Sequence, residues 1–461
     1  MRDLAVLALA DDLSGAAETA AALMSSALRA DIALDSGAVL SAYNAQNSGK
    51  ARALVVDLDS RQSDADRAGD ALAGMLAQRG PTGPRVLVKI DSLLRGNVAA
   101  TLSAVGPAVL APALPVGGRT VVDGAVRVDG TPLRETTAWG AEPGSAPDSI
   151  AQVLAPVPCR SVSLAEVRRD PRTAIAETLA AGRIPVCDAE TDSDLDAVVA
   201  ATPPEVALVG SGGLAAALGR SFRHGNAARR PDFAPRDDRA LLVVVGTAEP
   251  GAAVQVRRLV EAGARSLDLH VDRLAHADPP PAEIERIAEA VRQQPTALRL
   301  HAPRGVDPAL SRVLVRRLAD TVRRVVATVE DVDLVLTGGE TARGVLDALD
   351  VRALRPVAQV HHGAVLSLTA DARSVVTRPG SFGDPDSLVR ILRHLRPRFP
   401  SPPTTFPPTA DPPTASPSTT DPARTSPPTA SLPTTDPATT SPRTTSLPTT
   451  APGLVPGSTE G

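Results

Sequence analysis

The sequence has few cysteines, since Cys159 and Cys187 are the only two in 461 residues. Two cysteines form neither a disulfide framework nor a four-ligand zinc site, and they favour a reducing compartment, so we expect a cytoplasmic protein. No apolar run approaches the roughly 18 residues that a membrane-spanning helix needs. The apolar AVLALA near the N-terminus is too short for a secretory signal. The sequence therefore predicts no membrane partner.

Strong net charge and aromatic side chains are also scarce. The formal net charge of −4 provides no broad field for binding nucleic acid, so any anionic ligand must be held by a local cluster. The composition is 43% apolar but only 2% aromatic, so the core must consist of Ala, Val and Leu. This composition is typical of helices packed on a parallel sheet.

Continuous apolar runs alternate with segments of helical spacing along most of the chain. LAVLALA (4–10), ALVVDLD (53–59) and RVLVKID (85–91) each precede such a segment, and a second series begins with ALLVVVGTAEPG (240–251). This alternation predicts α/β architecture with largely parallel sheets. The Pro- and Gly-rich segment 111–150, which contains VDGAVRVDG, predicts a small β-ribbon inserted into the first series.

Two changes of composition predict the domain boundaries. The segment 223–239 is polar and contains proline, as interdomain linkers do, so we expect one α/β domain over 1–230 and a second over 231–397. From about 398 the chain consists mainly of Pro, Thr, Ser and Ala and contains a fifteen-residue repeat. Because this segment has almost nothing to bury, we expect a disordered tail over 398–461.

The segment DDLSGA (11–16) follows the first predicted strand. In a parallel sheet, the loop after a strand's carboxyl end faces the ligand crevice. Asp12 or Ser14 could simply cap the following helix. Two adjacent carboxylates followed by Ser-Gly exceed what a cap requires, however. Asp11, Asp12 and Ser14 are therefore candidates to bind a ligand's hydroxyl groups, and Asp12 to accept a hydroxyl proton.

The segment KIDSLLRGN (89–97) ends a neighbouring predicted strand and should face the same crevice. It combines two cations, a carboxylate, a hydroxyl and an amide: Lys89, Asp91, Ser92, Arg95 and Asn97. The planar guanidinium of Arg95 suits a carboxylate or phosphate, and Lys89 adds a compact charge. The alternative is a salt-bridge cluster of Lys89, Asp91 and Arg95 that only ties the strand to the next helix.

Three small-residue loops follow predicted strands of the second series: VVVGTAEPG (243–251), LTGGETA (336–342) and TRPGSFGD (377–384). Glycines let the backbone approach phosphate oxygens, and threonines at helix N-termini add hydroxyl donors. The sequence contains no P-loop motif, and no cluster has metal-ligand spacing, so no protein-built metal site is expected. The three loops together predict a phosphate-binding crevice, with Thr247 and Thr341 as hydroxyl donors.

The segment GSGGLA (210–215) mimics a dinucleotide-binding fingerprint, which keeps an NAD(P)-dependent dehydrogenase as an alternative. The acidic residue expected about 20 residues later is missing, so glycines that allow tight strand–helix packing are the better interpretation. His361, His362 and Cys187 also favour packing roles.

The order of these motifs resembles the four-carbon acid sugar kinases, and the resemblance covers residues 4–395. It implies an N-terminal sugar-acid domain and a C-terminal nucleotide domain. It also implies ATP and Mg²⁺ as cofactors, with ATP at Thr247, Gly338–Thr341 and Gly380. The chain departs from the family pattern where Glu18 stands for Asp, where Arg378-Pro379 stand for Lys-Ser, and where HHGAVLSL (361–368) replaces a proline-bearing loop.

The expected function is an ATP-dependent kinase that phosphorylates a hydroxyl group of a small sugar acid. Arg95 and Lys89 would neutralise the acid's carboxylate. Asp12, with Asp91 as second candidate, would orient or deprotonate the attacking hydroxyl. The expected partners are the sugar acid and ATP, and a homodimer is a possible assembly. A non-catalytic homologue that binds sugar acid or nucleotide is a further alternative.

Overall fold

The computed structural model describes residues 4–24, 28–34, 52–79, 83–139, 144–222, 233–247, 249–302, 310–380 and 382–399. These residues belong to one compact unit, Met1–Pro403. The predicted disordered tail lies outside the described residues, apart from its first two. Part of the predicted linker, residues 223–232, also lies outside them, and the division into two domains near 230 stays a prediction.

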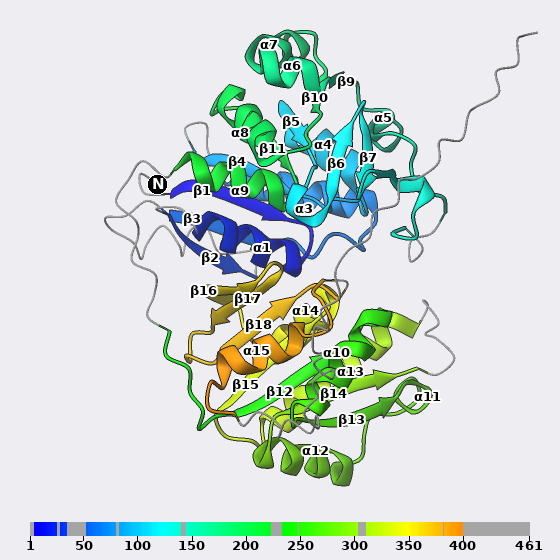
Figure 1. Ribbon diagram of the computed structural model, residues 1–461, viewed down its shortest axis with the longest axis vertical. Coiled ribbons are helices and arrows are strands. Elements are labelled where there is room, and N and C mark those ends of the chain that lie inside the picture. Colours follow the sequence, from blue (N-terminus) through cyan, green and yellow to red (C-terminus); the bar gives the residue numbers. More distant parts are fainter. Residues whose placement is uncertain are drawn as a thin grey trace, which may run out of the picture. The chain divides into compact units, whose positions relative to one another are not determined.

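Among the described residues, fifteen strands form one continuous sheet in the order β13-β14-β12-β15-β18-β17-β16-β2-β3-β1-β4-β11-β5-β10-β9 (Figure 1). Most neighbours pair in parallel, which confirms the predicted α/β class. The strands are β1 (Leu4–Ala10), β2 (Arg29–Ala33), β3 (Arg52–Asp57), β4 (Arg85–Lys89), β5 (Ala108–Ala111), β9 (Cys159–Val162), β10 (Ile184–Cys187), β11 (Ala207–Gly210), β12 (Ala240–Val245), β13 (Arg265–His270), β14 (Thr296–His301), β15 (Val332–Thr337), β16 (Ala353–His361), β17 (Ala364–Leu368) and β18 (Ser374–Arg378).

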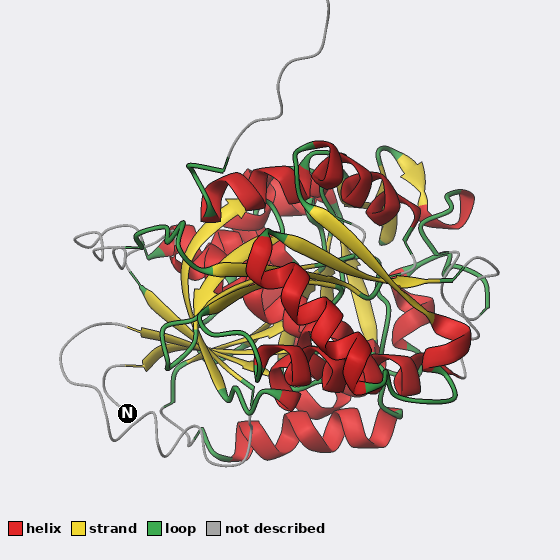
Figure 2. Ribbon diagram, turned by 90° about the horizontal axis from the view of Figure 1, so that it is seen from below, coloured by secondary structure: helices red, strands yellow, loops and turns green. Residues whose placement is uncertain are grey.

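Helices lie on both sides of the strands (Figure 2). In α15, for example, Leu388, Ile391, Leu392 and Leu395 are buried at helical spacing while the arginines between them face outward. In the described part of the chain, no helix is long and apolar enough to cross a membrane. The helices are α1 (Leu13–Met24), α3 (Ala65–Ala77), α4 (Val98–Val105), α5 (Ile150–Leu154), α6 (Leu164–Arg169), α7 (Pro171–Ala180), α8 (Asp192–Ala201), α9 (Gly212–Ser221), α10 (Pro250–Glu261), α11 (Val271–Leu274), α12 (Pro281–Gln293), α13 (Ser311–Val326), α14 (Gly339–Ala348) and α15 (Ser387–Leu395), with short 3₁₀ turns η1 (Pro115–Gly117) and η2 (Leu133–Glu135).

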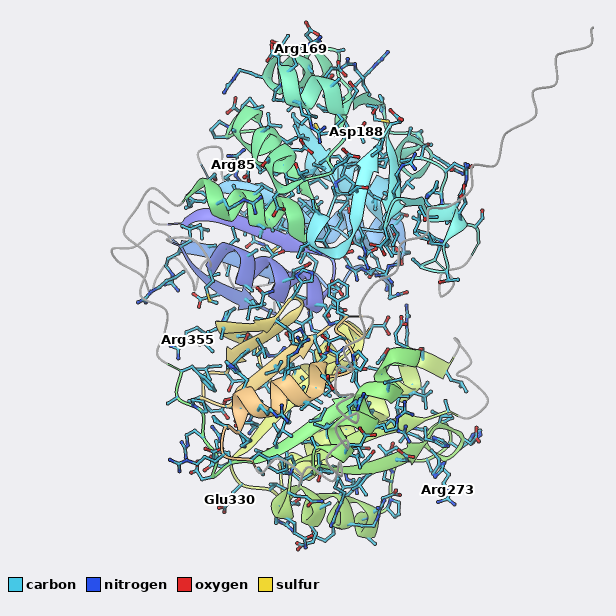
Figure 3. The ribbon with its side chains drawn as sticks, viewed as in Figure 1. Arg85, Arg169, Asp188, Arg273, Glu330 and Arg355 are labelled. Atoms are coloured by element: carbon cyan, nitrogen blue, oxygen red, sulfur yellow. The ribbon has the colours of Figure 1, made fainter. Side chains whose placement is uncertain are left out.

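The predicted β-ribbon is present as a separate three-stranded antiparallel sheet of β6 (Arg119–Val122), β7 (Ala125–Val128) and β8 (Thr131–Pro132). Asp123 and Gly124 both adopt positive φ angles, 53° and 69°, as a two-residue hairpin turn requires. Their amides donate to the carboxylate of Asp188 at 2.8 and 2.9 Å. Asp188, labelled in Figure 3, directly follows β10 of the main sheet. These two hydrogen bonds therefore fix the turn of the ribbon to the main sheet.

The sheet is continuous because β16 pairs with β2 in antiparallel orientation. Among the described residues, the strand pairs of this seam are Ala353 with Ala33 and Leu354 with Ile32, and next to them the Leu34 amide donates to the Arg352 carbonyl at 2.9 Å. β16 and β17 form a hairpin whose turn is His362-Gly363. The sequence analysis did not identify this hairpin because the turn lacks an Asn-Gly or Asp-Gly signal and β16 is irregular. The seam joins the two predicted domains through backbone hydrogen bonds.

The strand register places the predicted loops together. Ala10, at the end of β1, pairs with Asp57 of β3 and with Lys89 of β4, so the loops after these three neighbouring strands leave the sheet at one level. In the second series, Thr337 of β15 pairs with Val245 of β12 and Arg378 of β18. Carboxyl ends of neighbouring parallel strands thus meet at one edge in each series.

Candidate active site

A pocket of about 280 Å³ lies at these strand ends, and we call it the strand-end pocket. It brings together candidates from both series of the predicted site. Those that line it are Asp11, Asp12, Ser14, Arg95, Thr247, Gly338, Gly339, Glu340, Thr341 and Gly380. Lys89, Asp91, Ser92 and Asn97 are not among its lining residues. Residues that the sequence analysis did not select also line it, namely Leu13, Asp59, Arg61, Gln62, Gly246, Glu249, Ser311, Val315 and Pro379.

Arg61 is the central cation of the strand-end pocket. Its guanidinium donates to both carboxylate oxygens of Asp11, at 2.8 and 2.7 Å, and to Asp12 Oδ1 at 2.8 Å. Burial would lower the pKa of Arg61, but the charges of Asp11 and Asp12 hold it well above its usual value. Burial raises the pKa of Asp11 despite this contact. The strand-end rule applied to DSRQSD after β3 could have identified Arg61.

Asp12 and Ser14 face the glycine loop of the second series. Asp12 Oδ1 accepts a hydrogen bond from the amide of Gly15 at 2.8 Å. A Cβ atom on Gly339 would lie 2.8 Å from Asp12 Oδ2 and 3.2 Å from Ser14 Oγ. The Ser14 hydroxyl is buried and has no hydrogen-bond partner among the described residues. A buried hydroxyl of this kind fits a site whose ligand supplies the missing partner.

The remaining polar groups of KIDSLLRGN have partners within the protein. Lys89 Nζ lies 3.3 Å from Glu18 Oε2 and donates to the Ile90 carbonyl at 3.1 Å. The Ser92 hydroxyl accepts from Arg119. Asn97 Nδ2 donates to the carbonyls of Ser60 and Ser63 at 3.1 and 2.9 Å, which fixes the loop after β3. In this structure, these side chains hold neighbouring segments together.

Asp91 organises the turn of the same segment. Its carboxylate accepts from the Leu93 amide at 2.9 Å and from the Arg95 guanidinium at 2.9 and 2.7 Å. Burial would raise the pKa of Asp91, but the Arg95 hydrogen bonds and the charges of Arg61 and Arg95 hold it well below its usual range. A carboxylate with so low a pKa is a poor proton acceptor. Leu94, at φ 67°, adopts a backbone conformation unusual for leucine, and such strain concentrates at functional sites.

The loop between β15 and α14 presents a helix N-terminus to the strand-end pocket. Gly338 has φ 98°, and within the described residues no side chain caps the first turn of α14. A Cβ atom on Gly246 would collide with Thr341, and one on Gly380 would collide with Thr247. The three small-residue loops are therefore close to one another, and only glycine fits at these positions. This arrangement suits a phosphate group.

Arg378, one of the departures from the family pattern, does not face the strand-end pocket. It is fully buried, donates to Gln255 Oε1 at 2.6 Å and also donates to the Phe382 carbonyl. Gln255 in turn donates to the carbonyls of Gly383 and Asp384 at 2.9 and 3.1 Å. Burial lowers the pKa of Arg378 to about 10. Arg378 and Gln255 thus hold the loop after β18 in place.

Two carboxylates of the strand-end pocket could accommodate a cation. Burial raises the pKa of Asp59, and burial together with the charge of Asp59 raises the pKa of Glu340. Within the described ranges, no group of three or more His, Cys, Asp or Glu side chains could hold a metal ion by itself. The donor set fits Mg²⁺ that is bound mainly through phosphate oxygens, with one or two carboxylates from the protein.

The GSGGLA glycines are packing residues. Cβ atoms on Gly210 and Gly213 would collide with the carbonyls of Ala111 and Ala113, and one on Gly212 would collide with the Glu18 carboxylate. The Ser211 hydroxyl donates to the Ala113 carbonyl at 2.6 Å. Cys187 is also fully buried, and burial raises the pKa of its thiol.

Comparison with known proteins adds to this geometry. Residues 6–218 match a family model described as a sugar-binding N-terminal domain, and residues 242–388 match one described as a nucleotide-binding C-terminal domain. The chain is 32% identical over 409 residues to a D-threonate kinase of Cupriavidus necator, covering 83% of this chain and 96% of the relative. It is 30% identical over 421 residues to a 3-oxo-tetronate kinase of the same bacterium, covering 84% and 96%. A solved structure of a Salmonella typhimurium LT2 protein has the same fold, with a TM-score of 0.68, 22% identity and coverage of 85% and 99%.

Proposed function

The chain belongs to the four-carbon acid sugar kinase family, and on that premise we propose that it transfers a phosphoryl group from ATP to a hydroxyl group of a four-carbon sugar acid. The observation that carries the proposal is the strand-end pocket, where Asp12 and Ser14 face the glycine loop of α14. Phosphoryl transfer requires positioning and charge stabilisation more than covalent participation by the protein. The pocket offers both at one place.

Asp12 is the proposed catalytic residue. Its carboxylate lies against Gly339, so an attacking hydroxyl group held by this carboxylate would meet a phosphoryl group bound at the α14 loop. It would orient that hydroxyl and accept its proton. Arg61 contacts both carboxylate oxygens of Asp12 at 2.8 Å and so holds this carboxylate in place. Asp91 is the less suitable base, because Arg95 holds its pKa low.

The nucleotide would be held by Thr247, Gly380 and the first turn of α14, Gly339–Thr341. When bound, ATP supplies the phosphoryl group and Mg²⁺ neutralises part of its charge. Asp59 and Glu340 are the residues that would contact the metal ion. The uncapped amides of α14 would bind phosphate oxygens, and the small residues of the other two loops would leave room for them.

The proposal is tested by measuring ADP release from Mg²⁺-ATP by the full chain with a panel of four-carbon aldonic and oxo acids. Five- and six-carbon acids serve as controls. We expect selective turnover of a four-carbon acid and a loss of about 10²–10⁴-fold in kcat for Asp12→Asn, because the base is removed. Asp70→Asn, on the exposed face of α3, should retain wild-type rates.

Two other outcomes would contradict the proposal. Absence of turnover with all acids, while ATP raises the melting temperature, would favour a non-catalytic homologue. A melting temperature raised by NAD⁺ but not by ATP would favour a dehydrogenase instead.

A further inference from the structure

A second pocket, of about 400 Å³, lies beside the β-ribbon, and we call it the ribbon pocket. Three parts of the chain that are distant in sequence form it: the start of β6, the turn between β16 and β17, and the loop after β18 together with α15. Its lining residues are Gly117, Arg119, His361, His362, Phe382, Gly383, Asp384 and Arg390. The functional assignments made above use none of them.

Arg119 brings a positive charge to the ribbon pocket. Its guanidinium lies 5.4 Å from the centre of the Phe382 ring and donates to the Ser92 hydroxyl. Burial lowers the pKa of Arg119, and in the described part of the chain no carboxylate forms an ion pair with it. Arg390, on the same pocket, is already paired with Asp384 at 2.8 Å. Arg119 is therefore the cation that is available to an anionic ligand.

Glu18 and His362 form an incomplete polar pair near Arg119. Glu18 Oε1 and His362 Nε2 are 3.7 Å apart, too far for a hydrogen bond. Both atoms are buried and have no hydrogen-bond partner within the described ranges. A hydroxyl group placed against them would donate to the Glu18 carboxylate and accept from the imidazole. The second Glu18 oxygen is engaged by Lys89 at 3.3 Å, which fixes the carboxylate.

Phe382 brings the cation and the polar pair together. The His362 ring stacks on Phe382 with 5.3 Å between ring centres, and Arg119 contacts the same phenyl ring. The charge of Glu18 also acts on the Arg119 guanidinium. Arg119 and Glu18 both contact the segment KIDSLLRGN: Arg119 donates to Ser92, and Glu18 forms an ion pair with Lys89. That segment carries Arg95 into the strand-end pocket, so the two pockets share one segment.

We propose that the ribbon pocket binds the end of the sugar acid that carries the carboxylate and its adjacent 2-hydroxyl group. Arg119 takes the carboxylate, and the Glu18–His362 pair takes the hydroxyl. This assignment rests on the proposed kinase function and deepens it. It replaces the expectation that Arg95 and Lys89 bind the carboxylate, because each of those cations already has a carboxylate partner.

The test compares the steady-state kinetics of the full chain and its variants with D-threonate, with the uncharged polyol threitol, and with 3,4-dihydroxybutanoate, which lacks the 2-hydroxyl. For Arg119→Gln we expect KM for D-threonate to rise at least tenfold, KM for ATP to stay unchanged and the preference for the acid over threitol to collapse. For His362→Ala we expect the preference for D-threonate over 3,4-dihydroxybutanoate to fall. Arg127→Gln is the matched control, because Arg127 lies on β7 of the same β-ribbon but does not line the ribbon pocket, and it should keep the wild-type KM.

Arg119→Gln with wild-type KM and wild-type preference for the acid would overturn the assignment. Arg119→Lys keeps the charge and guards against a folding defect: it should retain most of the preference for acid over polyol. Failure of the kinase proposal can be distinguished from failure of the ribbon-pocket assignment, because in the first case the wild-type chain would turn over no acid. In that case D-threonate should still raise the melting temperature of the wild type more than that of Arg119→Gln. An equal shift in both, or none in either, would also overturn the assignment.

Discussion

Burial raises the pKa of Asp57 to about 7 even though Arg343 lies 2.9 Å away. The folded chain therefore holds a proton between pH 3.8 and about 7 that the unfolded chain releases. The stability from this group is fully present below pH 3.8 and is lost as the pH rises to about 7. Between pH 5 and pH 8 the loss is about 2–3 kcal/mol of the free energy of unfolding.

Asp57→Asn removes this titration, so its stability relative to the wild type should improve as the pH rises from 5 to 8. Urea-unfolding midpoints of both proteins at the two pH values measure the effect. A difference between variant and wild type that does not change with pH would contradict the assignment.

Arg95 should matter for both stability and catalysis, because it neutralises the buried carboxylate of Asp91 and also lines the strand-end pocket. Arg95→Ala leaves Asp91 buried without its main partner, a change that typically costs 3–5 kcal/mol. We expect a lower melting temperature together with a loss of roughly ten- to a hundredfold or more in kcat/KM. Arg95→Ala combined with Asp91→Asn should recover part of the melting temperature but not the activity. Wild-type kinetics in Arg95→Ala would refute a role for Arg95 in the site.

Single residues were predictable where they follow a strand in a polar cluster. Asp11 and Asp12, selected by this rule, both line the strand-end pocket, because strand ends of a parallel sheet converge. Arg119 and His362 were not assigned a ligand, since the ribbon and the β16–β17 hairpin bring them beside Glu18 only in the folded chain. No local pattern encodes contacts between segments more than a hundred residues apart.

Among the elements, α14 links the second series of strands to the loop after β3 of the first series. Its first turn lines the strand-end pocket, and one turn further on Arg343 reaches across to Asp57 at the end of β3 and to the Leu34 carbonyl at 2.7 Å. Asp57 also accepts from the amide of Asp59, which lines the pocket. A ligand that positions α14 should therefore also position the loop after β3.

We expect ATP analogue and sugar acid to bind cooperatively, and Arg343→Gln to reduce the coupling factor several-fold, because the bridge between the two elements is lost. Calorimetric titration of each ligand with and without the other measures the factor. Arg299→Gln is the matched control, since Arg299 pairs with Asp268 at 2.8 and 2.7 Å between two strands of one series. Unchanged coupling in Arg343→Gln would exclude this bridge as the connection.

Elements with strong periodicity were predictable to within a few residues. The segments of helical spacing that follow the first three apolar runs form α1, α3 and α4, and α3 begins after the Asp64 cap. The β16–β17 hairpin was missed because its irregular strand and His-Gly turn carry weak local signals. Its pairing with β2 is set by tertiary contacts.

At the scale of the whole molecule, deletion of residues 404–461 tests whether the tail contributes to stability or activity. The sequence there offers almost nothing to bury, so we expect the melting temperature and kcat/KM to stay at wild-type values. Differential scanning fluorimetry and the ADP-release assay on both forms make the comparison. A clear drop in either quantity would show that the tail docks on the rest of the chain.

The α/β class and the inserted ribbon followed from the alternation of apolar runs and turns. The joining of both series into one sheet could not be predicted from this alternation, because it depends on the short pairing between β2 and β16. A seam this short contributes no pattern that stands out in the sequence.

The seam also has a consequence for synthesis of the chain. β2 leaves the ribosome more than 300 residues before its partner on β16, Ala353 and Leu354. Until then, the nascent N-terminal series has β2 as an open strand edge, which is a surface prone to pairing with other chains. We therefore expect chains truncated before residue 353 to aggregate more readily than the complete chain, and the closing of this edge to be a late step of folding.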